Sequence, residues 1–180
     1  MKQNTFKIQD LCMIGLFSAI LAITAQISIP MPFGVPMTMQ SFAVTLAGIV
    51  LGSRNGALST LIYMLVGLIG LPVFANFVGG WQVLAGPTGG FILSFPIMAY
   101  LIGLGTELRP KWKFSHWTGI ILGTTFNLLC GTIMFCAITQ SPFMVGLTTC
   151  TLPFIPASII KAILASMLGL NIRRRLQAFL

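Results

Sequence analysis

The sequence predicts an all-α integral membrane protein, and three of its properties support that fold class. Hydrophobic residues make up 56% of the 180 residues, with a mean hydropathy of +0.97. Charged residues make up only 7%, against about 25% in soluble domains. The apolar residues gather in six stretches of the length that crosses a bilayer, roughly 17–25 residues. No intervening segment suggests a soluble domain, so a single transmembrane domain over residues 1–180 is expected.

Each expected span is bounded by proline, glycine or charged residues, as helix ends commonly are. The six spans cover residues 11–30, 37–53, 55–71, 87–106, 118–140 and 152–172. The first follows Lys2 and Lys7, and a basic start before an apolar run is also typical of a cleaved signal peptide. A retained span is favoured, because the apolar run continues to Ile29. In addition, the charged segments fall on the same side of the membrane only if this segment is one of the crossings.

The sequence predicts a sharp turn between spans two and three and a kink within span four. Spans two and three are short and are separated by Arg54 alone, so we expect a tight helical hairpin. The fourth span contains Pro96, which lacks a backbone N–H and is expected to kink it.

Small residues recur at a spacing of four in several spans, and such rows let helices pack closely in lipid. They are Gly15 and Ala19; Gly48, Gly52 and Gly56; and Gly119 and Gly123. Most are expected to serve internal packing. The first span also offers small residues on which a partner protein could dock: Gly15, Ser18, Ala19 and Ala22.

Almost all charges fall on one predicted side of the membrane. The basic residues precede span one, separate spans two and three, separate spans four and five, or follow span six, with an even number of crossings between these places. Both acids, Asp10 and Glu107, fall on the same side, which the positive-inside rule assigns to the cytoplasm. The opposite loops, 31–36, 72–86 and 141–151, carry no charge. We therefore expect a multi-pass protein of the cell membrane with both termini inside.

Lys161 is the exception, because it lies about ten residues from the outer start of span six. At 1.5 Å per residue its depth is about 15 Å, where a charge costs roughly 2.5–3.5 kcal/mol on insertion scales. Neither acid of the chain reaches that depth. Snorkelling to the surface is one alternative, and a pore lining or a carboxylate of a partner subunit is another. A buried cation that awaits an anionic ligand is favoured.

Two of the uncharged outer loops mix hydrogen-bonding groups with prolines or aromatic residues. The first leads into Thr38 and Gln40, and the loop after span three contains Phe74, Asn76, Phe77, Trp81 and Gln82. Unpaired polar groups are costly at the edge of the hydrocarbon, so this mixture suggests a lined cavity. An interfacial aromatic belt accounts for some of the tryptophans. The GPTGG run at 86–90 lacks the ending of a phosphate loop, but it offers close backbone approach to a ligand.

Other functional classes find less support. An enzyme usually needs paired acids, a metal cluster or an activated nucleophile, whereas this chain offers two edge acids and His116, interpreted as a solvated loop residue. The cysteines, which lack the spacing of a metal site, are Cys12, Cys130, Cys136 and Cys150. The net charge of +8 is scattered, which does not favour nucleic acid. No metal, cofactor or catalytic residue is expected; a membrane-embedded transferase and a small channel stay as alternatives.

Four segments together resemble the BioY family, the biotin-specific membrane subunits (S components) of energy-coupling-factor (ECF) transporters. They are PMTMQSFAVTLAGIVLGSRNG, YMLVGLIGLPVFA, GPTGGFILSFPIMAYLIG and LPFIPASIIKAILA. The resemblance implies a six-helix S-component bundle that binds biotin with high affinity in an outward-facing pocket, closed by the loops after spans one and three. Biotin is then the transported ligand, and another small anionic vitamin is the alternative.

The resemblance also implies where the pocket lies. Lys161 matches the lysine of a family Pro-Phe-x-x-x-Asp-x-x-Lys pattern, Thr38 and Gln40 match a Thr-x-Gln motif, and residues 86–90 match a Gly-Pro-Thr-Gly-Gly motif. Together with the loop residues, the expected substrate-binding set is Lys161, Ser158, Asn76, Gln82, Trp81, Phe74, Thr38, Gln40, Gly86, Thr88, Gly89, Phe91 and Phe154.

One position departs from the family pattern. Ser158 stands where the family usually carries aspartate, three residues before Lys161 and on the same helical face. Serine can accept a hydrogen bond but does not neutralise the lysine. The implied partners are biotin, membrane lipids, a transmembrane coupling protein and two cytoplasmic ATPases, in a bacterial plasma membrane. Whether the chain also forms a homo-oligomer stays open.

Overall fold

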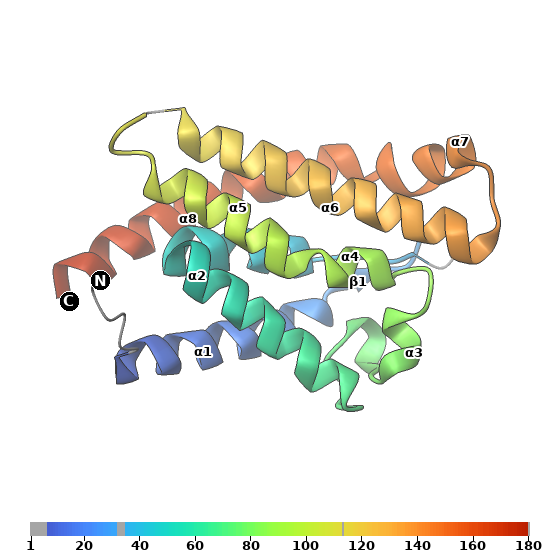
Figure 1. Cartoon of the computed structure of the whole chain (residues 1–180), viewed down its shortest axis with the longest axis horizontal. Helices are drawn as coiled ribbons and strands as arrows, with labels where there is room; N and C mark the ends of the chain where they lie inside the picture. Colours follow the sequence, from blue (N-terminus) through green and yellow to red (C-terminus); the bar gives the residue numbers. More distant parts are fainter. Residues whose placement is uncertain (1–6, 32–34, 113, 180) are drawn as a thin grey trace, which may run out of the picture.

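The computed structural model describes residues 7–31, 35–112 and 114–179, with side chains to residue 176, and it is mostly helical. The long helices lie side by side in one bundle (Figure 1). Within the described residues, four helices are long and apolar enough to cross a membrane: α1 (Ile8–Ala25), α2 (Gln40–Leu68), α6 (Ser115–Thr139) and α8 (Phe154–Phe179).

Helix α2 contains the expected hairpin, and the chain reverses at Gly52 rather than at Arg54. Gly52 has φ 87° and ψ −175°, a left-handed conformation that only glycine adopts readily. Positions 48 and 56 would lie about 12 Å apart on a straight helix, yet a Cβ added to Gly56 would lie 3.0 Å from the Cα of Gly48. Glu107 accepts hydrogen bonds from Ser53 N (2.7 Å) and Ser53 Oγ (2.9 Å), which satisfies the start of the second arm.

The expected kink at Pro96 is confirmed as a break between α4 (Gly89–Leu93) and α5 (Phe95–Glu107). The helices meet at Ser94, and Pro96 lies in the first turn of α5, where a missing N–H costs least. The small-residue rows of α2 and α6 serve packing as expected, whereas Gly15 on α1 has no neighbour within 4 Å of an added Cβ. A Cβ on Gly119 of α6 would lie 2.9 Å from the Cα of Gly105 on α5, so the two backbones approach closely.

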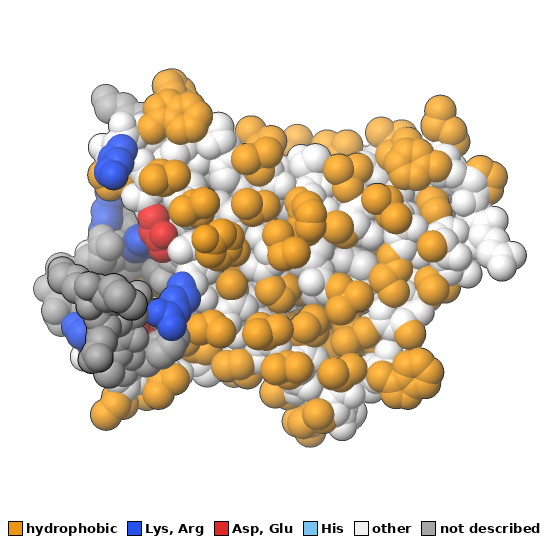
Figure 2. All heavy atoms as spheres, viewed as in Figure 1, with side chains coloured by type: hydrophobic (Ala, Val, Ile, Leu, Met, Phe, Trp, Pro, Cys, Tyr) orange, Lys and Arg blue, Asp and Glu red, His pale blue; other side chains and the backbone are white. Residues whose placement is uncertain are grey.

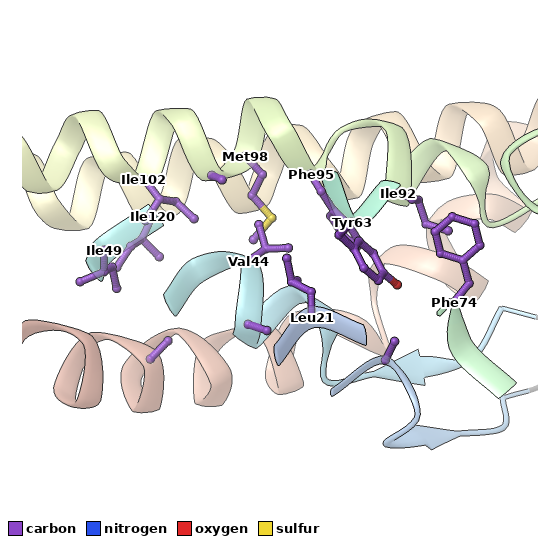
Figure 3. Packing of buried hydrophobic residues seen from close by; sticks show 14 of the residues in the cluster. Leu21, Val44, Ile49, Tyr63, Phe74, Ile92, Phe95, Met98, Ile102 and Ile120 are labelled. Atoms are coloured by element: carbon purple, nitrogen blue, oxygen red, sulfur yellow. The ribbon is translucent and has the colours of Figure 1, made fainter. Parts of the chain in front are cut away.

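The largest buried cluster lies between α1, both arms of α2, α5, α6 and α8 (Figure 3). Its fully buried side chains include Leu21, Ile49, Met98 and Ile102. At the end of the cluster nearest the loop after α2, the rings of Tyr63 and Phe74 meet edge to face with centroids 5.6 Å apart. The core therefore continues into that loop.

Two expected spans have different ends in the structure. The first helix stops at Ala25, because residues after it form strand β1 (Ser28–Ile29), which pairs antiparallel with β2 (Met37–Thr38). The outer segment 141–151, expected as a loop, contains α7 (Phe143–Gly146) and a π-helical turn η3 (Leu147–Thr151).

The interpretation of His116 as a solvated loop residue is wrong. Helix α6 begins at Ser115, three residues earlier than expected, and His116 is only 2% exposed. Its Nδ1 lies 3.0 Å from Thr106 Oγ1 and its Nε2 lies 2.8 Å from Ser166 Oγ. The imidazole thus joins α5, α6 and α8 inside the bundle.

Charge and apolar surface separate along the bundle. The start of α1 and the end of α8 lie at the same end (Figure 1), and Figure 2 shows the Lys, Arg, Asp and Glu side chains of this face gathered there. The rest of the face is covered by hydrophobic side chains. This distribution is what a chain embedded in a bilayer requires.

Candidate ligand-binding site

A cavity of about 290 Å³ lies at the end of the bundle away from the charged edge, close to the lower limit of about 300 Å³ for small-molecule pockets. The β1–β2 connection, the start of α2, the loop after α2, α4, α6 and α8 all contribute to it. Eleven of the thirteen expected binding residues line it: Lys161, Ser158, Asn76, Gln82, Phe74, Thr38, Gln40, Gly86, Thr88, Phe91 and Phe154.

Lys161 enters the cavity from α8 and crosses to the start of α2. Its Nζ donates to the backbone carbonyl of Thr38 at 2.7 Å and to Ser41 Oγ at 3.4 Å. Among the described residues, the cavity lining contains neither Asp nor Glu. Ser158 lines the same cavity, so the expected shared face of these two residues is confirmed. The ammonium is therefore held by neutral oxygens only, beside open space.

A directional chain of hydrogen bonds starts at the side chain of the same threonine. Thr38 Oγ1 donates to Gln40 Oε1 at 2.7 Å, and Gln40 Nε2 donates to Tyr63 Oη at 2.6 Å. Tyr63 Oη in turn donates to the carbonyl of Val73 at 3.1 Å, at the start of the loop after α2. Polar groups buried in a low dielectric polarise one another in such chains. The start of α2, its second arm and this loop are thereby connected.

Aromatic rings form the apolar wall opposite the loop. Phe91 of α4 and Phe154 of α8 stack with centroids 6.2 Å apart and an interplanar angle of 19°. Phe91 lies directly over Gly131 of α6, where an added Cβ would overlap the ring unless the ring moved. Both rings also pack with the buried cluster of Val35, Phe135 and Cys150, which anchors the end of the first outer loop.

The loop after α2 supplies the remaining wall from a short 3-10 turn, η2 (Ala75–Phe77), and α3 (Trp81–Leu84). Phe74 is buried and lines the cavity beside Asn76. Ser28 Oγ of β1 donates to Asn76 Oδ1 at 2.8 Å. The loops that follow α1 and α2 are therefore in direct contact at the cavity.

Two expected binding residues do not line this cavity. Trp81 is 69% exposed at the start of α3, which suits a ring at the membrane interface. Gly89 is buried against the Leu84 carbonyl and the Met134 side chain, so its lack of a side chain serves packing.

Sequence reasoning missed Asn127, Ser41 and Thr124, which also line the cavity. Asn127 Nδ2 donates to the carbonyl of Phe91 at 2.8 Å and to Ser94 Oγ at 2.7 Å, at the break between α4 and α5. An amide in the middle of an apolar span is as informative as Lys161, because lipid offers it no partner. That signal was present in the sequence.

The residues proposed for partner docking do not share one face. Gly15 and Ala19 are exposed on α1, and Ala22 is half-buried. Ser18 is buried and donates to the carbonyl of Ser59 on the second arm of α2 at 2.7 Å. The exposed surface of α1 therefore includes Gly15 and Ala19 but not Ser18.

The cavity combines aromatic walls, several amide and hydroxyl groups, and one ammonium. This arrangement suits a small, partly apolar molecule that carries hydrogen-bonding groups and a negative charge or a strong acceptor. No cluster of potential metal ligands occurs among the described residues.

Comparisons with known proteins agree over nearly the whole chain. The sequence model of the BioY family matches residues 1–178. The biotin transporter BioY2 of Lactococcus lactis subsp. cremoris is 38% identical over 174 residues, which are 97% of this chain and 94% of that protein. The biotin transporter BioY of Thermotoga maritima is 37% identical over 162 residues, which are 89% and 93% of the two chains. A crystal structure of the S component for biotin from an ECF-type ABC transporter superposes with a TM-score of 0.85 at 28% identity, covering 97% of this chain and 95% of that one.

Proposed function

The chain belongs to the BioY family, and we propose on this basis that it is the biotin-binding S component of an ECF-type transporter. It takes part in biotin uptake as a membrane subunit and not as an enzyme. The observation that carries the proposal is the ammonium of Lys161, which borders a cavity whose described lining residues include neither Asp nor Glu.

The chemistry of biotin fits the cavity group by group. The hydrocarbon and thioether part of its fused rings is apolar and suits the stacked Phe91 and Phe154. Its ureido group has two N–H donors and one carbonyl, which suit Asn76, Gln82 and Ser158. Its carboxylate and its ureido oxygen are both acceptors for Lys161. A charge-assisted bond in a dehydrated site is worth about 1.5–3 kcal/mol, which supports high-affinity binding.

The proposed topology has six crossings with both termini in the cytoplasm. The two arms of α2 on either side of Gly52 count as two crossings, and α4 with α5 count as one, beside α1, α6 and α8. The charged end of the bundle is then the cytoplasmic end by the positive-inside rule, and the cavity opens outward. The whole chain forms a single transmembrane domain of the bacterial plasma membrane.

Transport needs partners, because binding alone supplies no energy for accumulation. The proposed partners are a transmembrane coupling protein and two cytoplasmic ATPases, with the exposed small residues Gly15 and Ala19 of α1 as the docking face.

Titration calorimetry of the detergent-purified chain tests the ligand. Biotin should bind and release heat at one site per chain, desthiobiotin should bind more weakly through its altered ring, and an unrelated anionic vitamin such as pantothenate should not compete. Absence of biotin binding to folded protein would overturn the proposal.

A double-mutant-type cycle then identifies the group that meets Lys161. Biotin and biotin amide are titrated into the parent chain and into Lys161→Ala. If the carboxylate meets Lys161, biotin amide should bind more weakly than biotin to the parent chain, and the two ligands should bind equally to Lys161→Ala. If the ureido oxygen meets Lys161, the Kd of biotin and the Kd of biotin amide should rise by the same factor in Lys161→Ala.

A further inference from the structure

Gln26 is the residue that follows the last turn of α1, and its side chain bonds to a loop about fifty residues further along the chain. Its Nε2 donates to the carbonyl of Phe74 at 3.0 Å and to the carbonyl of Ala22 at 3.1 Å. Its Oε1 accepts from the backbone N–H of Phe77 at 2.9 Å. One amide thus holds both ends of the turn from Phe74 to Phe77, and we refer to these bonds as the Gln26 clamp.

The clamped turn has an unusual backbone. Asn76 has φ 61° and Phe77 has φ 55°; asparagine adopts positive φ more often than other non-glycine residues, but a bulky residue such as phenylalanine seldom does. Such conformations persist only where the surroundings enforce them. The bond from Phe77 N to Gln26 is a contact of that kind, made from a different helix.

The same turn forms part of the cavity wall. Phe74, Ala75 and Asn76 all line the cavity. The neighbouring carbonyl of Val73 accepts a hydrogen bond from the hydroxyl of Tyr63, at the end of the chain of bonds that starts at the Thr38 side chain. The turn is therefore fixed from two sides, by the ligand-site network and by α1.

We propose that Gln26 is a positioning residue for ligand binding: the clamp keeps the Phe74–Phe77 turn over the cavity, and its loss speeds ligand release. The proposal rests on the proposed function, since biotin is the ligand used to test it. An amide is required because the site needs a donor and an acceptor at once. Glutamate at position 26 would face the Phe74 and Ala22 carbonyls with oxygen only.

The test uses the full chain in detergent with three variants. Gln26→Met keeps the length and removes the bonds, Gln26→Glu keeps the acceptor alone, and Gln140→Ala is the matched control. Gln140 caps the C-terminal end of α6 as Gln26 caps that of α1, but its side chain is exposed. Biotin association and dissociation rates are measured by stopped flow, and amide hydrogen exchange is followed by mass spectrometry.

For both Gln26 variants we expect the dissociation rate to rise about tenfold, as for loss of one or two net hydrogen bonds. Exchange should quicken in peptides covering residues 72–80 and stay unchanged in α5 and α6. Gln140→Ala should match the parent. Unchanged dissociation and exchange in Gln26→Met would overturn the proposal, and so would faster exchange throughout the bundle, which would make Gln26 a residue of general stability. If the parent chain itself fails to bind biotin while exchange in 72–80 still quickens in the variants, the proposed function fails and the clamp stands as a structural contact.

Discussion

Gly131 allows a direct test of the aromatic wall. A Cβ at this position would overlap three carbons of the Phe91 ring, Cδ1, Cε1 and Cζ. Carbon atoms pack at about 3.5–4.0 Å, so in Gly131→Ala the ring must retreat from α6 by about 1 Å or more. The space on its other side is the cavity and the stacked ring of Phe154.

The size of the effect follows from the cost of overpacking, about 1–3 kcal/mol. Without ligand, the ring relieves the overlap by moving into the cavity. Biotin must push the ring back, so the strain opposes binding and the Kd should rise roughly 5-fold to 140-fold at 1.4 kcal/mol per tenfold. The melting temperature without ligand should change little for the same reason.

Calorimetry with biotin and a thermal unfolding scan measure both quantities. Ile133→Ala, at a 58% exposed position of the same helix, is the control and should bind like the parent. The double variant Gly131→Ala/Phe91→Leu should regain part of the affinity, because a smaller side chain clears the new methyl group. Parent-like affinity in Gly131→Ala would refute the assignment of Phe91 as a wall of the ligand site.

Three further outcomes are expected. Lys161→Ala should weaken biotin binding at least tenfold by calorimetry, since it removes a charge-assisted bond worth about 1.5–3 kcal/mol; equal affinity would exclude the lysine from the site. His116→Ala should leave Ser166 Oγ without its imidazole partner, at about 1–3 kcal/mol, while Thr106 Oγ1 keeps its bond to the Ile102 carbonyl; the melting temperature should fall with no change in Kd for biotin, and a selective loss of binding would contradict its structural role. Ala19→Leu should leave binding by the isolated chain intact but reduce biotin uptake by cells that contain the coupling protein and ATPases; normal uptake would remove this face of α1 from docking.

Composition and span length predicted the helical bundle, but the position of its sharpest turn depended on packing. The expected turn lay at Arg54, and the three glycines near it, Gly48, Gly52 and Gly56, were expected only to serve packing. The structure uses Gly52, where Glu107 caps the arm that follows through Ser53. A contact across more than fifty residues of sequence selects among three similar glycines, and no local pattern encodes it.

The candidate site was predictable where a residue was out of place in lipid. Lys161 lies in an apolar stretch, which reasoning from solvation singles out, and the same reasoning applied to span five would have found Asn127. Trp81 was assigned to the cavity because aromatic residues crowd its loop, but composition does not say which way a ring points. Gln26 was unpredictable, because its role depends on positive φ values at two non-glycine residues.

The ammonium of Lys161 has three N–H donors, and among the described residues two are taken by the Thr38 carbonyl and Ser41 Oγ. A ligand can therefore bind the third donor, or replace the long 3.4 Å bond to Ser41, while the bond to Thr38 persists. It follows that Lys161→Ala removes two things, the contact with the ligand and the support of Thr38 at the head of the chain that reaches Val73. Biotin amide removes the charge of the ligand if the lysine meets the carboxylate. The affinity that this uncharged ligand still loses in Lys161→Ala then measures the support of Thr38 together with a neutral hydrogen bond to the amide oxygen. A loss confined to biotin would mean that the network holds its shape without the lysine and that the charge serves only the ligand.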